Sequence, residues 1–99
     1  MWNTRGPIPP GAVLRNEFMA PLGLNVRQLA HELHVPVTQL QEVVAGRRPV
    51  KAGLALRLGR YFGVHPETWL NLQANYDLHK TERQIGRKIE QMVMPLEAA

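Results

Sequence analysis

Proline and glycine divide this sequence into short segments, and their spacing limits the fold more than any other feature of the chain. Pro10, Pro21, Pro36 and Pro66 stand at segment boundaries, and Gly46 follows an apolar run. Proline suits the first turn of a helix and interrupts a later one, whereas glycine suits the position just after a helix. Between these residues, apolar side chains recur three and four positions apart, and no alternating strand pattern occurs. We therefore expect an all-α fold.

The pattern predicts five short helices joined by short turns. Asn25 is a suitable N-cap for the second helix. The helices are expected over residues 10–20, 26–33, 36–45 and about 51–62, with a fifth from residue 66 to beyond residue 78. The apolar spacing of residues 85–96 permits a further helix without requiring one. We expect an N-terminal arm (1–9), a helical domain (10–80) and a C-terminal extension (81–99).

Composition indicates one small globular domain and excludes several chemistries. The 99 residues are 44% hydrophobic and 20% charged, which is ordinary for a folded domain. No cysteine or serine is present, so disulfides, cysteine zinc sites and serine or cysteine nucleophiles are excluded. His31 and His34 are three residues apart, whereas the zinc-protease motif needs four. We expect no enzyme, no metal and no cofactor.

The charge balance favours an anionic partner. Twelve lysines and arginines oppose eight acidic residues, for a formal net charge of +4. Such an excess in a small domain favours nucleic acid, although a solvated basic surface would give the same balance. The N-terminus shows no apolar signal segment, and no apolar stretch is long enough to span a bilayer. A cytoplasmic location without a membrane partner is therefore expected.

Residues 26–45 read VRQLAHELHVPVTQLQEVVA, a pattern typical of a helix-turn-helix. Leu29 and Leu33 form an apolar face, and Ala30 is small enough for two helices to cross closely. His34 occupies the turn, where a left-handed backbone favours glycine and histidine is tolerated. The second helix of such a motif enters the DNA major groove. A helical corner without a DNA function would show similar apolar spacing.

With Leu40 facing inward, the N-terminal part of this second helix is expected to face DNA. Glutamine can pair with adenine, and the methyl groups of valine and threonine can contact thymine, so a half-site rich in A·T is expected. The expected base-reading residues are Val37, Thr38, Gln39 and Gln41, and the expected phosphate contacts are Arg27, Gln28, Arg47, Arg48 and Lys51. Plain exposure to solvent is the alternative for both groups. Glu42 borders this face, where it would repel phosphate, accept a hydrogen bond from cytosine or point away.

The predicted fifth helix is the expected place of a symmetric dimer contact. Helix-turn-helix proteins commonly bind as dimers because each subunit contacts one half-site. Trp69 is expected in the core of the domain. The expected dimer contacts are Leu70, Tyr76 and Leu78, together with the tail.

Nearly the whole chain resembles the HigA-type antitoxins, in the VapI/XRE branch of the lambda-repressor-like proteins. The resemblance is carried by the segment that begins Ile8-Pro-Pro-Gly-Ala-Val-Leu-Arg, by Gly46-Arg-Arg-Pro-Val and most specifically by Trp69-Leu-Asn-Leu-Gln-Ala-Asn-Tyr-Asp-Leu. The chain departs from the family pattern at Pro9, Ala12 and Val37.

The resemblance implies a five-helix lambda-repressor-like bundle and a homodimer that binds double-stranded operator DNA ahead of its own operon. It also implies a partner, a RelE-like toxin of the HigB type that cleaves mRNA. Two alternatives stay open. One is a stand-alone repressor without a toxin, and the other is a protein-interaction module that keeps the helix-turn-helix as a scaffold.

Overall fold

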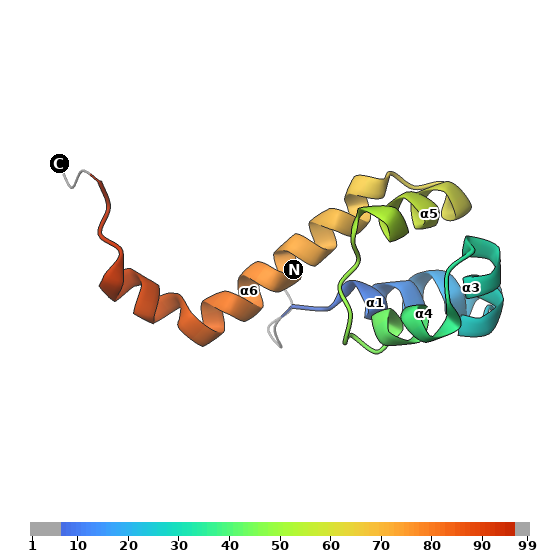
Figure 1. The fold of residues 1–99 in the computed structure, drawn as a ribbon, viewed down its shortest axis with the longest axis horizontal. Helices are drawn as coiled ribbons and strands as arrows, with labels where there is room; N and C mark the ends of the chain where they lie inside the picture. Colours follow the sequence, from blue (N-terminus) through green and yellow to red (C-terminus); the bar gives the residue numbers. More distant parts are fainter. Residues whose placement is uncertain (1–6, 97–99) are drawn as a thin grey trace.

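The computed structural model describes residues 7–96, and every regular element in that range is a helix (Figure 1). The elements are α1 (Pro10–Val13), the π-helix η1 (Leu14–Met19), α2 (Ala20–Leu22), α3 (Val26–Leu33), α4 (Val37–Val44), α5 (Ala52–Phe62) and α6 (Pro66–Met92). The first three follow one another without a break and form one continuous helix. The predicted all-α, five-helix fold is therefore confirmed. Residues 1–6 of the expected arm and 97–99 of the expected extension lie outside the described residues.

The first helix continues through Pro21, where the sequence predicted its end. Its middle part, η1, is a π-helix, in which each N–H bonds to the carbonyl five residues earlier, as Ala20 does to Arg15. We attribute the tolerance of Pro21 to this wider turn, which displaces the carbonyl that the proline ring would meet in an α-helix. The helix ends instead at Gly23, whose left-handed backbone (φ 67°) is typical of the residue after a helix.

One hydrophobic core lies between two layers, with α5 and the first turns of α6 on one side and the other helices on the opposite side (Figure 1). Fully buried side chains come from both layers: Leu14, Leu29, Leu40, Val43, Leu58 and Trp69. Burial of each large apolar side chain stabilises the fold by about 1.5–3 kcal/mol. The core therefore holds α3 and α4 in place from behind and leaves their other faces in solvent.

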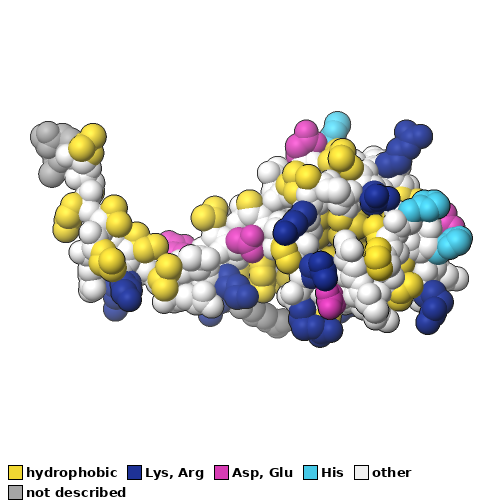
Figure 2. Space-filling model, viewed as in Figure 1, with side chains coloured by type: hydrophobic (Ala, Val, Ile, Leu, Met, Phe, Trp, Pro, Cys, Tyr) yellow, Lys and Arg dark blue, Asp and Glu magenta, His cyan; other side chains and the backbone are white. Residues whose placement is uncertain are grey.

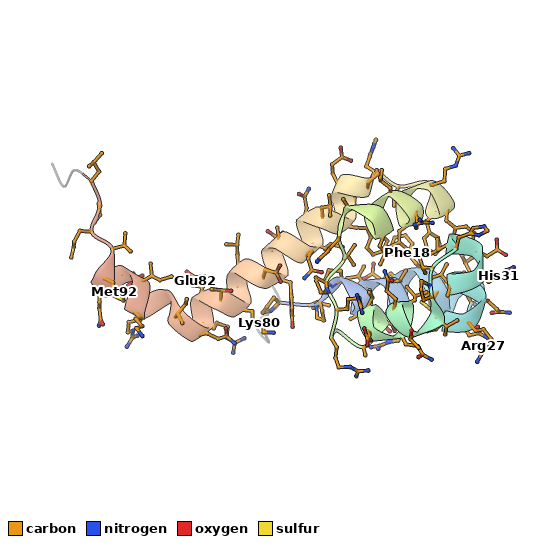
Figure 3. All side chains as sticks on the ribbon, viewed as in Figure 1. Phe18, Arg27, His31, Lys80, Glu82 and Met92 are labelled. Atoms are coloured by element: carbon orange, nitrogen blue, oxygen red, sulfur yellow. The ribbon has the colours of Figure 1, made fainter. Side chains whose placement is uncertain are left out.

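An aromatic cluster that includes the buried Trp69 joins the two layers. The ring of Phe18 lies 5.0 Å from that of Trp69 and 5.1 Å from that of Phe62, in tilted arrangements that aromatic pairs favour. Figure 3 shows Phe18 inside the globular body. The expected core position of Trp69 is thereby confirmed.

Gly11 allows the first helix to cross α4 at very short range. A Cβ atom at this position would lie 1.8 Å from the carbonyl oxygen of Val43, so only a hydrogen atom fits there. Val43 is itself buried. This backbone contact therefore sets the distance between α4 and the first helix.

α6 extends well beyond the globular body (Figure 1). Its first turns pack against α5 and α1, whereas the side chains after Leu78 are almost all exposed. The molecule measures 54 × 26 × 25 Å and has a radius of gyration of 16.5 Å, against about 13 Å for a compact chain of this length. The tail is thus helical as far as Met92, and α6 crosses the expected domain boundary at residue 80 without a break. None of the described helices is both long and apolar enough to span a membrane.

Candidate nucleic-acid interface

α3 and α4 form the predicted pair of helices, joined by a tight turn. α3 begins at a capping box, in which Gln28 N–H donates to Asn25 Oδ1 (2.8 Å) and Asn25 N–H donates to Gln28 Oε1 (2.9 Å). It ends at His34, whose backbone is left-handed (φ 58°), as the sequence predicted for the turn. Val35 N–H then donates to the carbonyl of Ala30 (3.1 Å), which closes the turn before α4 starts.

α4 turns a polar face toward solvent. It begins after Pro36, which is the N-cap and not the first helical residue, one position later than predicted. Leu40 is buried, as expected, whereas Thr38 and Gln41 are exposed. These two residues therefore have the outward orientation that base reading requires, and their contacts with bases stay predictions.

Val37 and Gln39 are half-buried and less accessible than the sequence suggested. Val37 packs against the core, although the sequence analysis placed it on the outward side. The reason is that Val37 lies three residues before Leu40 and so shares the inward face of α4. A contact between Val37 and DNA would have to use the part of this side chain that stays accessible.

Glu42, beside the exposed face of α4, forms an ion pair with Arg48. Arg48 donates from Nε (2.8 Å) and Nη2 (2.7 Å) to Glu42 Oε1, and both side chains are about half exposed. An ion pair this exposed stabilises the fold by only about 0–1 kcal/mol. Its main effect is electrostatic, because Arg48 offsets a carboxylate that would otherwise repel phosphate. The expected phosphate contact of Arg48 stays a prediction, now for a side chain that already has an acidic partner.

The loop between α4 and α5 carries the other expected phosphate contacts on this side, Arg47 and Lys51, and both are exposed. Val50 anchors this loop, because its side chain is buried and its N–H donates to Oε1 of Gln73 on α6 (2.8 Å). Nε2 of Gln73 donates in turn to Oδ1 of Asp77 (3.0 Å).

Gln73 contributes to this site and was not predicted from the sequence. Its one signal was its place in the segment of residues 69–78 that carries the family resemblance. Periodicity could not reveal it, because Val50 and Gln73 are far apart along the chain.

At the other edge of α4, Arg27 and Gln28 lie exposed in the first turn of α3. Oε1 of Gln28 is occupied by the capping box, and its Nε2 group retains two donor hydrogens. Figure 3 shows Arg27 at the end of the body opposite the projecting part of α6, and Figure 2 shows lysine and arginine side chains spread over the body and along α6. Arg57 on α5 donates to the carbonyl of Leu33 (2.9 Å) and so holds the end of α3 to α5.

The three expected dimer contacts lie along α6 where it leaves the body. Leu70 and Leu78 are exposed, and Tyr76 is half-buried with Lys80 Nζ 5.8 Å from the centre of its ring. They are accessible in the single chain, and their role in a dimer stays a prediction.

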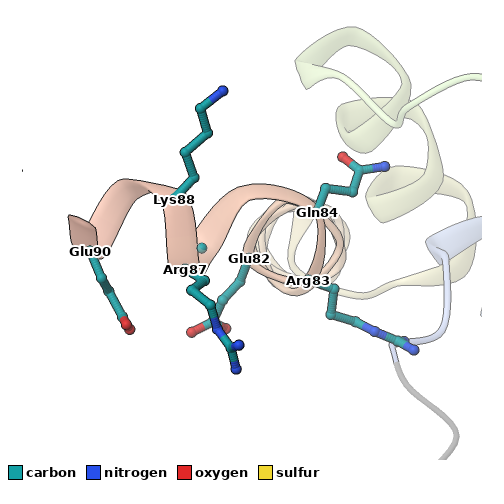
Figure 4. A pocket seen from close by; sticks show the side chains of 7 residues that line it. Glu82, Arg83, Gln84, Arg87, Lys88 and Glu90 are labelled. Atoms are coloured by element: carbon teal, nitrogen blue, oxygen red, sulfur yellow. The ribbon is translucent and has the colours of Figure 1, made fainter. Parts of the chain in front are cut away.

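A shallow depression further along α6 does not form a binding site (Figure 4). All of its lining residues belong to that one helix: Glu82, Arg83, Gln84, Gly86, Arg87, Lys88 and Glu90. It is therefore a groove between exposed side chains of a single helix, without a second wall.

No protein-family model matches the chain. Among curated proteins, the chain is 43% identical to virulence-associated protein I of Dichelobacter nodosus, over 82% of this chain and 75% of that protein. It is 31% identical to antitoxin HigA-1 of Vibrio cholerae, over 93% of this chain and 86% of that one.

Solved structures match the fold along almost the whole chain. The Pseudomonas aeruginosa antitoxin HigA with the higBA promoter has a TM-score of 0.89 at 36% identity, covering 92% of this chain and 99% of that one. The antitoxin GraA in complex with its operator has a TM-score of 0.89 at 38% identity, covering 99% of both chains.

Proposed function

The chain belongs to the HigA family of helix-turn-helix antitoxins, and from this premise we propose that it is a DNA-binding repressor of its own operon. We propose further that it is the antitoxin of a HigB-type, RelE-like toxin that cleaves mRNA. In both roles it acts by binding, without enzymatic activity. The relatives whose structures match this chain include one with its promoter and one with its operator.

One observation on this chain supports DNA binding most directly, namely the exposed polar face of α4 between two groups of cationic or donor side chains. Thr38 and Gln41 lie exposed on α4, Arg27 is exposed on the preceding helix α3, and Arg47 and Lys51 are exposed in the loop that follows α4. A recognition helix needs this arrangement, because base edges are read from its N-terminal part while phosphates are held on both flanks.

In the complex that we propose, the N-terminal half of α4 enters the major groove of the operator. Gln41, and Gln39 with the accessible part of its side chain, pair with adenine, and Thr38 contacts a thymine methyl group, which favours a half-site rich in A·T. Arg27, the amide of Gln28, Arg47, Arg48 and Lys51 contact phosphates and set the register of the protein on the duplex.

We propose that the functional unit is a homodimer formed through α6. Leu78, Ile85 and Met92 are seven residues apart on the projecting helix, and 69%, 44% and 69% of their surfaces are exposed, with Ile89 beside them. We call these four residues the α6 stripe. A heptad repeat of exposed apolar residues is typical of a helix that pairs with another helix. A second copy of the same helix is the partner expected for a protein that reads two half-sites.

One experiment tests both parts of the proposal. The protein is tagged and expressed together with the small open reading frame beside its gene. The molecular mass of the purified material is measured, and the material is then titrated with DNA from the region upstream of the gene. Recovery of two different chains together with sequence-specific DNA binding supports an autoregulating antitoxin. Recovery of this chain alone with DNA binding leaves a stand-alone repressor. A second chain without any DNA binding favours a protein-interaction module.

A further inference from the structure

We propose that Gln73 is a positioning residue for operator binding, because it holds the α4–α5 loop (residues 45–51) in the geometry that presents Arg47 and Lys51 to phosphates. The inference rests on the proposed DNA binding and adds a residue that is remote from the DNA face in sequence. Gln73 itself lies on α6 and reaches the loop through its hydrogen bond with Val50.

A hydrogen bond from Val50 ties this loop to α6. Val50 N–H donates to Gln73 Oε1 at 2.8 Å across a part-buried contact. Pro49, just before it, has no N–H group and cannot make such a bond. Without Gln73, the N–H of Val50 would lose its acceptor in a place with restricted access to water, which is unfavourable.

Asp77 determines which end of the Gln73 amide faces the loop. An ionised carboxylate can only accept hydrogen bonds, so the amide must direct its Nε2 group toward Asp77 Oδ1 (3.0 Å). The oxygen of the same amide then faces Val50. Because Asp77 follows Gln73 by four residues on a regular helix, the two side chains are neighbours on one face.

The loop is thus held from both flanks. On the α4 side, Glu42 binds the guanidinium of Arg48, and its carbonyl accepts from the N–H groups of Arg47 and Arg48 (2.8 and 3.2 Å). On the α6 side, Gln73 binds Val50. Fixing the loop before DNA arrives lowers the conformational entropy that binding would otherwise remove.

The test is a rescue series on the full-length protein, titrated with its upstream DNA at several salt concentrations. Gln73→Met keeps the length of the side chain and removes the acceptor, and we expect operator affinity to fall about tenfold. We also expect the dependence of log affinity on log salt to flatten by about one unit, because a released loop loses a phosphate contact. A purely structural defect would lower the fraction of folded protein and leave this slope unchanged.

The double variant Gln73→Glu with Asp77→Asn should restore both the affinity and the slope. A glutamate oxygen still accepts from Val50 N–H, and the asparagine amide donates to the glutamate in place of the original bond. The net charge of this pair is the same as in the wild type, so the rescue cannot come from a change in total charge. Asn75→Met is the matched control, since Asn75 is an exposed amide on α6 whose side chain makes no hydrogen bond within the described part of the chain.

The proposal is overturned if Gln73→Met keeps the wild-type salt slope, if Asn75→Met causes the same loss, or if the double variant fails to recover binding. Hydrogen exchange at the Val50 amide gives a readout without DNA, and we expect this amide to exchange faster in Gln73→Met. Equal exchange in both proteins also overturns it. Wild-type protein that binds no upstream DNA would refute the proposed function and this role together. Faster Val50 exchange in Gln73→Met would then show that the hydrogen bond between Gln73 and Val50 holds the loop but does not serve DNA binding.

Discussion

Gln41 and Arg47 both belong to the proposed DNA interface, but their side chains suit different parts of the DNA. The amide of Gln41 carries both a donor and an acceptor, which is the combination that distinguishes adenine from other bases. The guanidinium of Arg47 carries only donors and a charge, and at the edge of the motif it suits phosphate. Both side chains are exposed, so neither needs to leave the core before it binds.

We expect Gln41→Ala to weaken binding at one position of each half-site by about 1–3 kcal/mol. Fluorescence anisotropy with single-base operator variants measures this effect. The variant should bind the original base pair and its substitutes almost equally, because the side chain that discriminated between them is absent. Its salt dependence should stay at the wild-type value.

Arg47→Ala is the contrasting variant for that experiment. It should weaken binding to every DNA sequence alike and flatten the salt dependence by about 0.9. A uniform loss over all base variants in Gln41→Ala would exclude Gln41 from base reading.

Gly11 is the residue whose replacement we expect to be most damaging to the fold. Gly11→Ala would place a methyl group 1.8 Å from the carbonyl oxygen of Val43, so the first helix and α4 would have to separate. We expect a loss of about 3 kcal/mol in unfolding free energy and a fall in Tm of more than about 10 °C. Gly53→Ala in α5 is the control, because its Cβ would meet open space, and it should change stability by less than about 1 kcal/mol, in the stabilising direction.

At the scale of elements, the helix-turn-helix is set by how α3 begins and ends. The Asn25–Gln28 capping box fixes its start, and the left-handed His34 with the Arg57 bond to Leu33 fixes its end. Only three residues, His34 to Pro36, separate α3 from α4, so an error in this turn would rotate the whole recognition helix. The geometry of this turn therefore determines the orientation of α4 and, through it, DNA binding.

His34 sits in a conformation that is unfavourable for a residue with a side chain, by about 1–2 kcal/mol. We expect His34→Gly to raise the unfolding free energy by about 0.5–1 kcal/mol, since the gain is reduced by the greater backbone freedom of glycine when unfolded. Urea denaturation measures the change. The control His31→Gly, in the helical part of α3, should lower the unfolding free energy by about 1 kcal/mol. A loss of stability in His34→Gly would mean that the ring contact with His31 (6.5 Å) outweighs the backbone strain.

At the scale of the whole molecule, the chain combines a compact body with a projecting helix (Figure 1). The same 27-residue helix carries Trp69 in the core, Gln73 at the loop and the α6 stripe outside the body. In a dimer formed through the stripe, each subunit would therefore have one rigid helix, α6, that connects the dimer contact to its own α4–α5 loop. This connection is the physical reason to expect that dimerisation sets the spacing of the two recognition helices.

We expect the double variant Ile85→Asp with Ile89→Asp to be monomeric in analytical ultracentrifugation, because two charges replace half-exposed apolar side chains (44% and 45%) in the stripe. Affinity for an operator with two half-sites should fall by roughly a hundredfold, since the second half-site is no longer bound by a linked subunit. Affinity for a single half-site should not change.

Gln91→Asp is the matched control for the stripe. It adds a charge of the same sign on the same helix, and at about 100° per residue it lies more than a quarter turn from the stripe. We expect this variant to remain a dimer. A wild-type chain that sediments as a monomer would exclude the dimer role of the stripe.

The sequence was sufficient for features that depend on residues close together along the chain. The Asn25 cap, the turn at His34 and the helix ends at Gly46 and Gly63 were all found where local backbone rules place them. The end predicted at Pro21 was wrong, because the π-helix before it is a property of backbone packing and has no short sequence signal.

By itself, then, the sequence determined the order of the helices, the inward face of α3 and the helix-turn-helix, since all of these follow from the 3.6-residue period and from capping. Only the tertiary structure decided that Arg48 is paired with Glu42, that Gln73 holds Val50 and that α6 projects from the body. The hydrogen bond between Val50 and Gln73 joins residues 23 positions apart. The direction of α6 depends on which of its turns meet other helices, and local rules contain no information about these distant contacts.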